Sequence, residues 1–421
     1  MTGVPAVALA AVLALGGPSG HPASHAPSDT LRLAEAVALA RSANPMLRAE
    51  QLQARASAER AAQTGAWPEP RLALGMKNRP LDGFGTEEEM TMNTVELSQM
   101  VPWPGKRGLS RERGRGTALA DSLLALEVEV GLGARVAELY FAMASADRAI
   151  QVMAETRLLL QAFQETATAM YGVGEAIQQD VLQAQVSVAR MTADIVVMEQ
   201  DRLAAQARFN ALLGRSPMTL VGVLELPEIG PPPPGVEALM ELARAGRPAL
   251  AAATARVGSA SAAVAAARKE WWPDLMLSVE YGQRPRYSDM MSLMVGFSVP
   301  VTGGARQRPM QREMEAMEAM AEASARDLEN ETFAMLAEQR AMAERARTLA
   351  DIYHHQVLPQ AQASVASAQS AYRVGRADFM TLVENQMTVN RYRIEEIRLA
   401  AEYHTAAAAI RALLGEREVG P

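Results

Sequence analysis

The sequence predicts a mainly helical fold with a small membrane β part and a two-fold internal repeat. Of its 421 residues 49% are hydrophobic but only 5% are aromatic, and the 25 methionines outnumber the 7 phenylalanines and 8 tyrosines together. Small and unbranched apolar side chains of this kind suit closely packed helices. The hydrophobic period also changes from helical to alternating and back to helical twice along the chain.

Matching motifs mark the internal repeat. Residues 171–214 and 372–415 align without a gap at an offset of 372 − 171 = 201 residues. Both segments begin with Tyr-x-Val-Gly and end with Ala-Leu-Leu-Gly, and an X-Pro pair followed by Trp-Pro precedes each of them. We therefore predict a first structural repeat over 27–230 and a second over 231–421, each in the order helix, strand, strand, long helix, helix.

The change of period places the individual elements. Membrane strands are expected where apolar and polar residues alternate, at about 71–78, 92–101, 275–282 and 292–299. Helices are expected over 34–65, 106–170, 176–213, 236–270, 306–371 and 377–414. Pro359 is expected to kink the fifth of these helices, because proline cannot donate the backbone hydrogen bond of a helix interior.

Composition and the first residues exclude several classes of protein. An apolar run over 4–17 precedes Pro, Ser, Gly and His, which predicts a signal peptide over 1–26 and hence export. No Lys or Arg precedes this run, so a disordered apolar tail is the alternative. The net charge of −7 argues against electrostatic binding of nucleic acid. Because the chain has no cysteine, thiol catalysis, disulfides and cysteine zinc sites are excluded.

The element lengths constrain where a membrane can lie. A helix of about 65 residues spans roughly 100 Å, over three times the hydrocarbon core of a bilayer, so the long helices lie outside the membrane. The strands have about the length that a tilted membrane strand needs, but four strands cannot close a barrel in lipid. Three chains would supply twelve strands. Tryptophans at the strand-helix junctions are expected at the membrane interface, with a plain soluble cap as the alternative: Trp67, Trp103, Trp271 and Trp272.

The sequence resembles a known family, the TolC-like outer-membrane factors, over about residues 30 to 415. The most specific similarity is the paired Tyr-x-Val-Gly motif at 171 and 372, with Asp-Val-Leu-Gln-Ala-Gln at 180–185. The stretch Ser-Gln-Met-Val-Pro-Trp-Pro-Gly-Lys-Arg at 98–107 resembles the heavy-metal efflux branch. The resemblance implies a homotrimer whose 12-stranded β-barrel in the outer membrane continues into a periplasmic α-helical barrel. It also implies a periplasmic adaptor and an inner-membrane pump of the RND type.

Candidate site residues follow from the repeat and from this resemblance. The turns where the long helices reverse are expected to be adaptor contacts, with a plain helix break as the alternative: Val173, Gly174, Glu175, Ala176, Val374, Gly375, Arg376 and Ala377. In TolC-like channels two acidic residues one turn apart form the periplasmic aperture. Here Thr381 occupies the first place and Glu384 the second, and their repeat partners Asp180 and Gln183 are further candidates. A solvated helix charge is the alternative for Glu384.

The expected function is a passive exit duct for heavy-metal cations in the outer membrane, and not an enzyme. The sequence has no phosphate-binding loop, no His-Glu-x-x-His and no nucleophile elbow, and we expect no cofactor. Met100 and Met294 are weak candidates for contact with a soft metal, because alternation places them on the inner face of the barrel. Methionine as flexible filler is the alternative. Drug efflux, type I secretion and a soluble periplasmic coiled-coil scaffold are the other functions left open.

Overall fold

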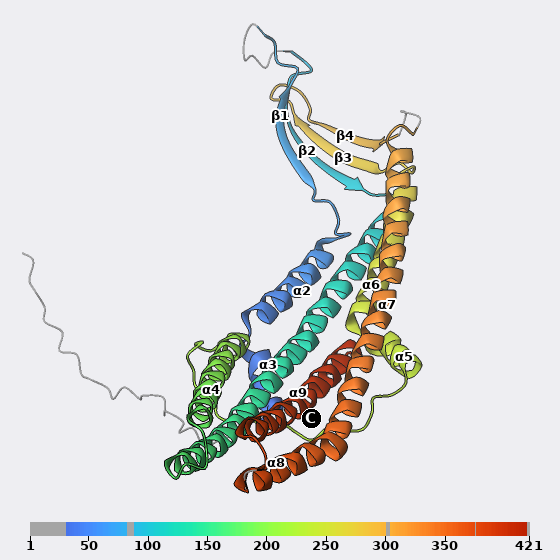
Figure 1. Cartoon of the computed structure of the whole chain (residues 1–421). Helices are drawn as coiled ribbons and strands as arrows, with labels where there is room; N and C mark the ends of the chain where they lie inside the picture. The colour runs from blue at the N-terminus through green and yellow to red at the C-terminus, as the bar shows by residue number, and fades with distance from the viewer. Residues whose placement is uncertain (1–30, 82–87, 300–303, 375, 419–421) are drawn as a thin grey trace, which may run out of the picture.

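The computed structural model describes residues 31–81, 88–299, 304–374 and 376–418. The expected signal peptide over 1–26 and Gly375 lie outside these residues. The described chain is elongated, with a curved sheet at one end and a bundle of long helices that runs away from it (Figure 1).

The same order of elements occurs in both halves of the chain. The first half comprises α1 (Leu33–Ala43), α2 (Pro45–Gln63), β1 (Arg71–Lys77), β2 (Met92–Val101), α3 (Lys106–Gly172) and α4 (Gln178–Leu212). The second half comprises α5 (Val236–Gly246), α6 (Pro248–Lys269), β3 (Leu275–Gln283), β4 (Met290–Phe297), α7 (Gln307–Ile352), the π-helix η1 (Tyr353–Val357), α8 (Leu358–Arg373) and α9 (Phe379–Leu413).

The structure divides two predicted helices that the sequence treats as continuous. The helix expected over 34–65 is α1 and α2, and the helix expected over 236–270 is α5 and α6. The residues at the breaks, Asn44 and Arg247, have extended backbones with ψ of 120° and 118°. Each precedes a proline, which disfavours the helical conformation of the residue before it and is itself well placed at the first position of the next helix.

The fifth predicted helix, expected over 306–371, is interrupted by η1. Pro359 has no backbone N–H, so the carbonyl of the residue four positions earlier loses its helical partner. The chain accommodates this by widening to a π-helix over Tyr353–Val357 before α8 begins. The predicted irregularity at Pro359 therefore takes the form of a π-helix in the turn before it.

The sheet joins the two halves of the chain. Its order is β1-β2-β3-β4, and every pair is antiparallel. β2 and β3 come from different halves and pair from Asn93 with Gln283 to Val101 with Leu275. Within this four-stranded sheet β1 and β4 are the edges, each with one side free of a neighbouring strand.

The helix α3 is the axis of the bundle. Its 67 residues give a length of about 100 Å at 1.5 Å per residue, and α2, α4, α6 and α9 all pack against it. By length and apolar composition alone, α4 and α6 could cross a membrane. Both pack against α3, but only 22% of the apolar window of α4 and 28% of that of α6 is buried within the described chain.

The two largest of four apolar cores among the described residues hold the helices at different levels. The first lies near the middle of α3, where Tyr140 and Phe141 pack with Phe209 of α4. The second lies toward the end of α3, where Leu160 and Phe163 pack with residues of α4, α8 and α9. Small residues separate these large side chains, which lets the helix axes approach closely.

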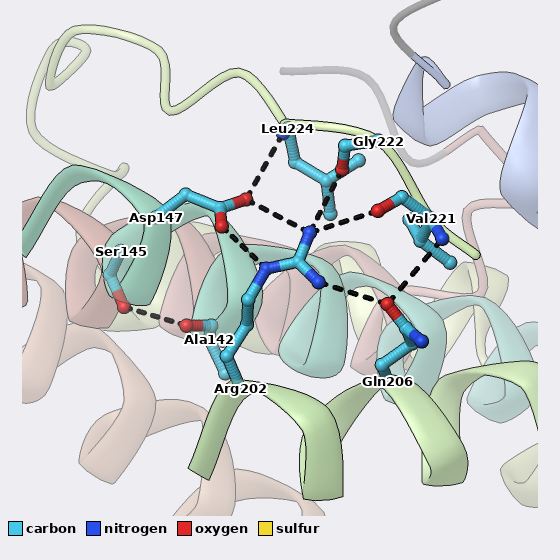
Figure 2. A network of polar contacts seen from close by, with 8 residues as sticks. All are labelled: Ala142, Ser145, Asp147, Arg202, Gln206, Val221, Gly222 and Leu224. Atoms are coloured by element: carbon cyan, nitrogen blue, oxygen red, sulfur yellow. Dashed lines mark hydrogen bonds and ion pairs between the residues drawn. The ribbon is translucent and has the colours of Figure 1, made fainter. Parts of the chain in front are cut away.

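A half-buried ion pair holds the extended segment that follows α4. The guanidinium of Arg202 contacts the carboxylate of Asp147 on α3 at 2.5 Å and donates to the carbonyl oxygens of Val221 at 2.9 Å and Gly222 at 3.1 Å (Figure 2). Asp147 in turn accepts from the backbone N–H of Leu224 at 3.4 Å. The guanidinium of Arg202 thus joins the linker carbonyl oxygens to the carboxylate of α3.

We expect Arg202→Ala to release this linker. Removing the guanidinium leaves the half-buried Asp147 carboxylate and two carbonyl oxygens of the linker without their donor, which costs on the order of 2 kcal/mol. Backbone amide exchange of Val221 and Leu224 should accelerate at least about tenfold, as measured by hydrogen-deuterium exchange. Arg398→Ala, which breaks an exposed pair with Glu395, is the control and should leave exchange in the linker unchanged. Equal exchange in the Arg202 variant and the native protein would contradict the assignment.

Candidate channel-lining and tip sites

The strand register separates the sheet into two chemically different faces. One face, here called the apolar face, carries Leu72, Leu74, Val95, Leu97, Leu277, Val279, Tyr281, Leu293, Val295 and Phe297, all exposed in the isolated chain. The opposite face, here called the polar face, carries Arg71, Lys77, Thr94, Glu96, Ser98, Ser278, Glu280 and Ser292. An apolar band outside and a polar surface inside are typical of membrane β-barrels.

Charges of both signs lie on the polar face. Glu96 and Glu280 are directly opposite each other on β2 and β3, and Lys77 of β1 forms an ion pair with Glu280. Carboxylates directly opposite on one face repel each other, so this arrangement costs stability. Water or cations next to this face screen the repulsion and reduce that cost.

The four tryptophans lie where the sheet meets the helices, and their place at a membrane interface stays a prediction. Trp103 and Trp272 come from different halves and stack with ring centroids 5.1 Å apart. Arg107 lies over the ring of Trp67 at 3.9 Å, and Trp271 packs beside Gly304. Stacked and cation-π contacts hold these amphipathic rings at one end of the strands.

A buried lysine ties the two junctions together. The ammonium of Lys106 lies 3.0 Å from Asp274 and 3.5 Å from Glu270. The backbone N–H of Trp103 donates to the same Asp274 carboxylate at 2.8 Å. The start of α3 is therefore fixed to the start of β3 by charge-assisted hydrogen bonds.

The turn between α3 and α4 is a Schellman motif. The N–H of Glu175 donates to the carbonyl oxygen of Met170 at 2.8 Å, and that of Gly174 donates to Tyr171 at 3.0 Å. Gly174 has φ of +80°, which favours glycine. The turn projects away from the bundle, since Val173 is 73% exposed and Glu175 is exposed as well.

The turn between α8 and α9 closes in the same way. The N–H of Arg376 donates to the carbonyl oxygen of Ala371 at 2.9 Å, and Val374 is 66% exposed. Ala377 is half-buried, as is Ala176 of the first turn. Both predicted tips are thus found at helix reversals, with an exposed valine on each.

The candidate aperture residues lie in the first turns of α4 and α9. Thr381 and Glu384 are exposed on α9, while Asp180 and Gln183 are half-buried on α4. Of these, Glu384 and Thr381 face away from the packed core of the chain, which leaves them available to line a shared opening.

The structure adds two residues to the candidate site, Asp378 and Tyr372, of which the sequence indicated Tyr372 only as the start of a repeat motif. Tyr372 and Phe379 pack in the core near the tips with ring centroids 5.4 Å apart, and Val181 packs against the same core. Asp378 and Asp180 precede Phe379 and Val181, so both carboxylates lie at the rim of this core. The Tyr372 side chain is 6% exposed, and its hydroxyl has no hydrogen-bond partner among the described residues.

The surroundings of Asp180 and Tyr372 shift the pKa of both side chains. Burial, and then the negative charge of Asp378, raise the pKa of Asp180 above its ordinary value of 3.8. Burial, and then both carboxylates, raise the pKa of Tyr372. The repeat could not predict Asp378 as a neighbour, because its partner at 378 − 201 = 177 is an isoleucine.

The described residues contain no cluster of three or more His, Asp and Glu side chains that could hold a metal ion. His354 contacts Glu396 of α9 at 2.7 Å, and His355 contacts Asp351 of its own helix at 3.1 Å. The two histidines of η1 therefore have separate carboxylate neighbours.

Comparison with known proteins gives the family. The model of the outer membrane efflux protein family matches residues 36–215 and 239–416, once in each half of the chain. The chain belongs to this family. Its members are channels and not enzymes, and they reside in the outer membrane with their helices in the periplasm. The alternative of a soluble periplasmic scaffold is therefore wrong.

Individual relatives agree with this membership. The chain is 26% identical over 360 residues to the pyoverdine export outer membrane protein OpmQ of Pseudomonas putida, covering 82% of this chain and 75% of the relative. The fold is similar to that of CusC, with a TM-score of 0.78, 17% identity and 92% of each chain covered. It is also similar to VceC of Vibrio cholerae, with a TM-score of 0.77, 15% identity, and 91% and 96% of the two chains covered.

We expect Asp180→Asn to stabilise the tip at neutral pH. Because the folded tip raises the pKa of Asp180, it binds the proton more tightly than the unfolded chain does. The stability contributed by this group is therefore present at low pH and is lost as the pH rises through its folded pKa. Amide exchange over 177–184 should be slower in the variant at pH 7, and the difference should shrink toward pH 4.

Asp201→Asn is the matched control, since it removes an exposed carboxylate from the same helix. It should leave exchange over 177–184 unchanged at both pH values. Faster exchange in the Asp180 variant at pH 7 would show that the carboxylate supports the turn.

Proposed function

We propose that three copies of this chain form a continuous passive duct through the outer membrane and the periplasm. The observation that carries the proposal is a four-stranded sheet with an exposed apolar face and two open edges. Lipid tolerates no unpaired strand edges, and three such sheets give a closed barrel of twelve strands. The apolar face then contacts lipid, and the polar face lines the lumen.

The long helices support a periplasmic extension of this duct. Their length of about 100 Å exceeds the membrane several times, and they leave the sheet in one direction. In a trimer they surround the same axis as the barrel. The tips between α3 and α4 and between α8 and α9 then lie farthest from the outer membrane and meet a periplasmic adaptor and an inner-membrane pump of the RND type.

Heavy-metal cations are the proposed cargo. The stretch 98–107 resembles the metal-exporting branch, and the polar face carries Glu96, Glu280 and several methionines. A second candidate is an organic cargo, favoured by the relative that is named for pyoverdine export. Lumen carboxylates attract cations, which favours the metal.

The trimer can be tested in native membranes, and the pore can be tested on the purified protein. Chemical cross-linking in native outer membranes should give a ladder that ends at three chains. The detergent-solubilised protein should form ion channels in planar lipid bilayers. A ladder that ends at two chains, or a protein that inserts without conducting, would overturn the proposal.

The aperture is tested by Glu384→Gln in the same bilayers. Three-fold symmetry turns each lumen-facing carboxylate into a ring that attracts cations. We expect lower cation selectivity and weaker block by multivalent cations added from the periplasmic side. Glu322→Gln on α7, an exposed carboxylate far from the tips, is the control. Unchanged selectivity and block in the Glu384 variant would remove this residue from the mechanism.

Adaptor contact at the tips is tested by the double substitution Val173→Asp and Val374→Asp. Both valines are exposed, so the change should leave the trimer intact while it disrupts an apolar contact with the partner. Growth of the source strain on a toxic cargo should fall to that of the deletion strain. Val223→Asp, an equally exposed valine in the linker, should retain growth. Loss of the cross-linked trimer in the double variant would instead assign the valines to assembly.

A further inference from the structure

Methionine is distributed over the sheet differently from every other large aliphatic residue. The four strands contain ten leucines and valines, and the register places all ten on the apolar face. They also contain seven methionines, of which five lie on the polar face: Met92, Met100, Met276, Met290 and Met294.

This distribution means that a need for apolar volume does not by itself explain the methionines of the polar face. A need for apolar volume on the polar face would be met by leucine or valine as well as by methionine, because these residues pack interchangeably at modest cost. The described strands place neither leucine nor valine there. The property that methionine has and leucine lacks is a polarisable sulfur.

Three of the five methionines lie on adjacent strands within reach of one another. Met100 of β2 is directly opposite Met276 of β3, and Met294 of β4 is the diagonal neighbour of Met276. Directly opposite residues have Cβ atoms about 5 Å apart and diagonal ones about 7 to 8 Å apart, which long side chains span. All three side chains are at least 43% exposed in the isolated chain.

A glycine keeps the space beside this group open. Gly296 is the residue directly opposite Met276 on β4, and a Cβ there would lie 3.7 Å from that of Met276. The same arrangement recurs near the other end of the strands, where the sulfur of Met92 lies over Gly282 and Met290 is paired with it. Between the two groups lie the opposed carboxylates of Glu96 and Glu280.

We infer that Met100, Met276 and Met294 form a binding site for soft monovalent metal ions, Cu(I) or Ag(I), on the polar face. Thioether sulfur is a preferred ligand for such ions, and three sulfurs can surround one ion. This inference rests on the proposed function, in which the polar face lines the lumen. The carboxylates concentrate cations, and the second methionine pair offers a further contact along the path.

Such a site suits transit better than storage. Flexible, exposed side chains bind an ion more weakly than a rigid cage does, and conduction requires sites that an ion can both enter and leave. Successive methionine groups on one face allow an ion to pass from one to the next.

Silver binding tests the site directly. The variant carries Met100→Leu, Met276→Leu and Met294→Leu, and the matched control carries Met314→Leu, Met317→Leu and Met320→Leu in a groove beside α7. Detergent-solubilised proteins are equilibrated with AgNO3, freed of excess silver and analysed by mass spectrometry of the metal. The strand variant should retain about one silver ion per chain fewer than the native protein, and the control should lose none. Equal silver in the strand variant and the native protein would overturn the inference.

Conductance in planar bilayers distinguishes failure of the site from failure of the pore. In KNO3, AgNO3 should reduce the current through the native channel, and half-block of the strand variant should need about tenfold more silver. The variant should conduct KNO3 as the native channel does. Native channels that conduct while both proteins show the same half-block would refute the site alone. Native protein that does not conduct would refute the proposed duct, and the silver-binding result would still decide the site.

Discussion

The hydrocarbon layer of a membrane offers no hydrogen bonds, so every backbone N–H and C=O within it needs a partner from protein. The chain has a four-stranded sheet with an exposed apolar face and two open edges, which would be unusual in a soluble protein. The constraint set by the membrane accounts for this sheet. The edges determine the proposed oligomer. In the proposed trimer the apolar face contacts lipid, and the polar face is left to contact the cargo.

Much of the fold could be predicted because period-two and helical patterns are local. The strand expected over 92–101 is found with the same bounds, and the faces of Met100 and Met294 follow from alternation. The breaks before Pro45 and Pro248 were not predicted, because apolar residues recur with helical spacing on both sides of them. There the conformational limit on the residue before proline outweighs the pattern.

The candidate site could be predicted only where one residue's own chemistry reveals it. Gly174 is visible in the sequence, since a helix reversal favours a residue that tolerates positive φ. The proximity of Asp180 and Asp378 is not visible, because it depends on how α4 and α9 pack around Tyr372 and Phe379. Met276 was likewise missed, since only the register between strands of different halves brings it opposite Met100.

The pairing of β2 with β3 also bears on how the chain reaches its folded form. Asn93 and Gln283 are partners across 283 − 93 = 190 residues, so the central pair of the sheet closes a long loop. Contacts between distant segments form slowly, because the entropy of closing the intervening chain is lost first. Because α3, α4, α5 and α6 lie between β2 and β3 in the chain, the first hairpin pairs with β3 only after these helices have been brought into place. Until then its apolar face and its edges are exposed, which favours aggregation.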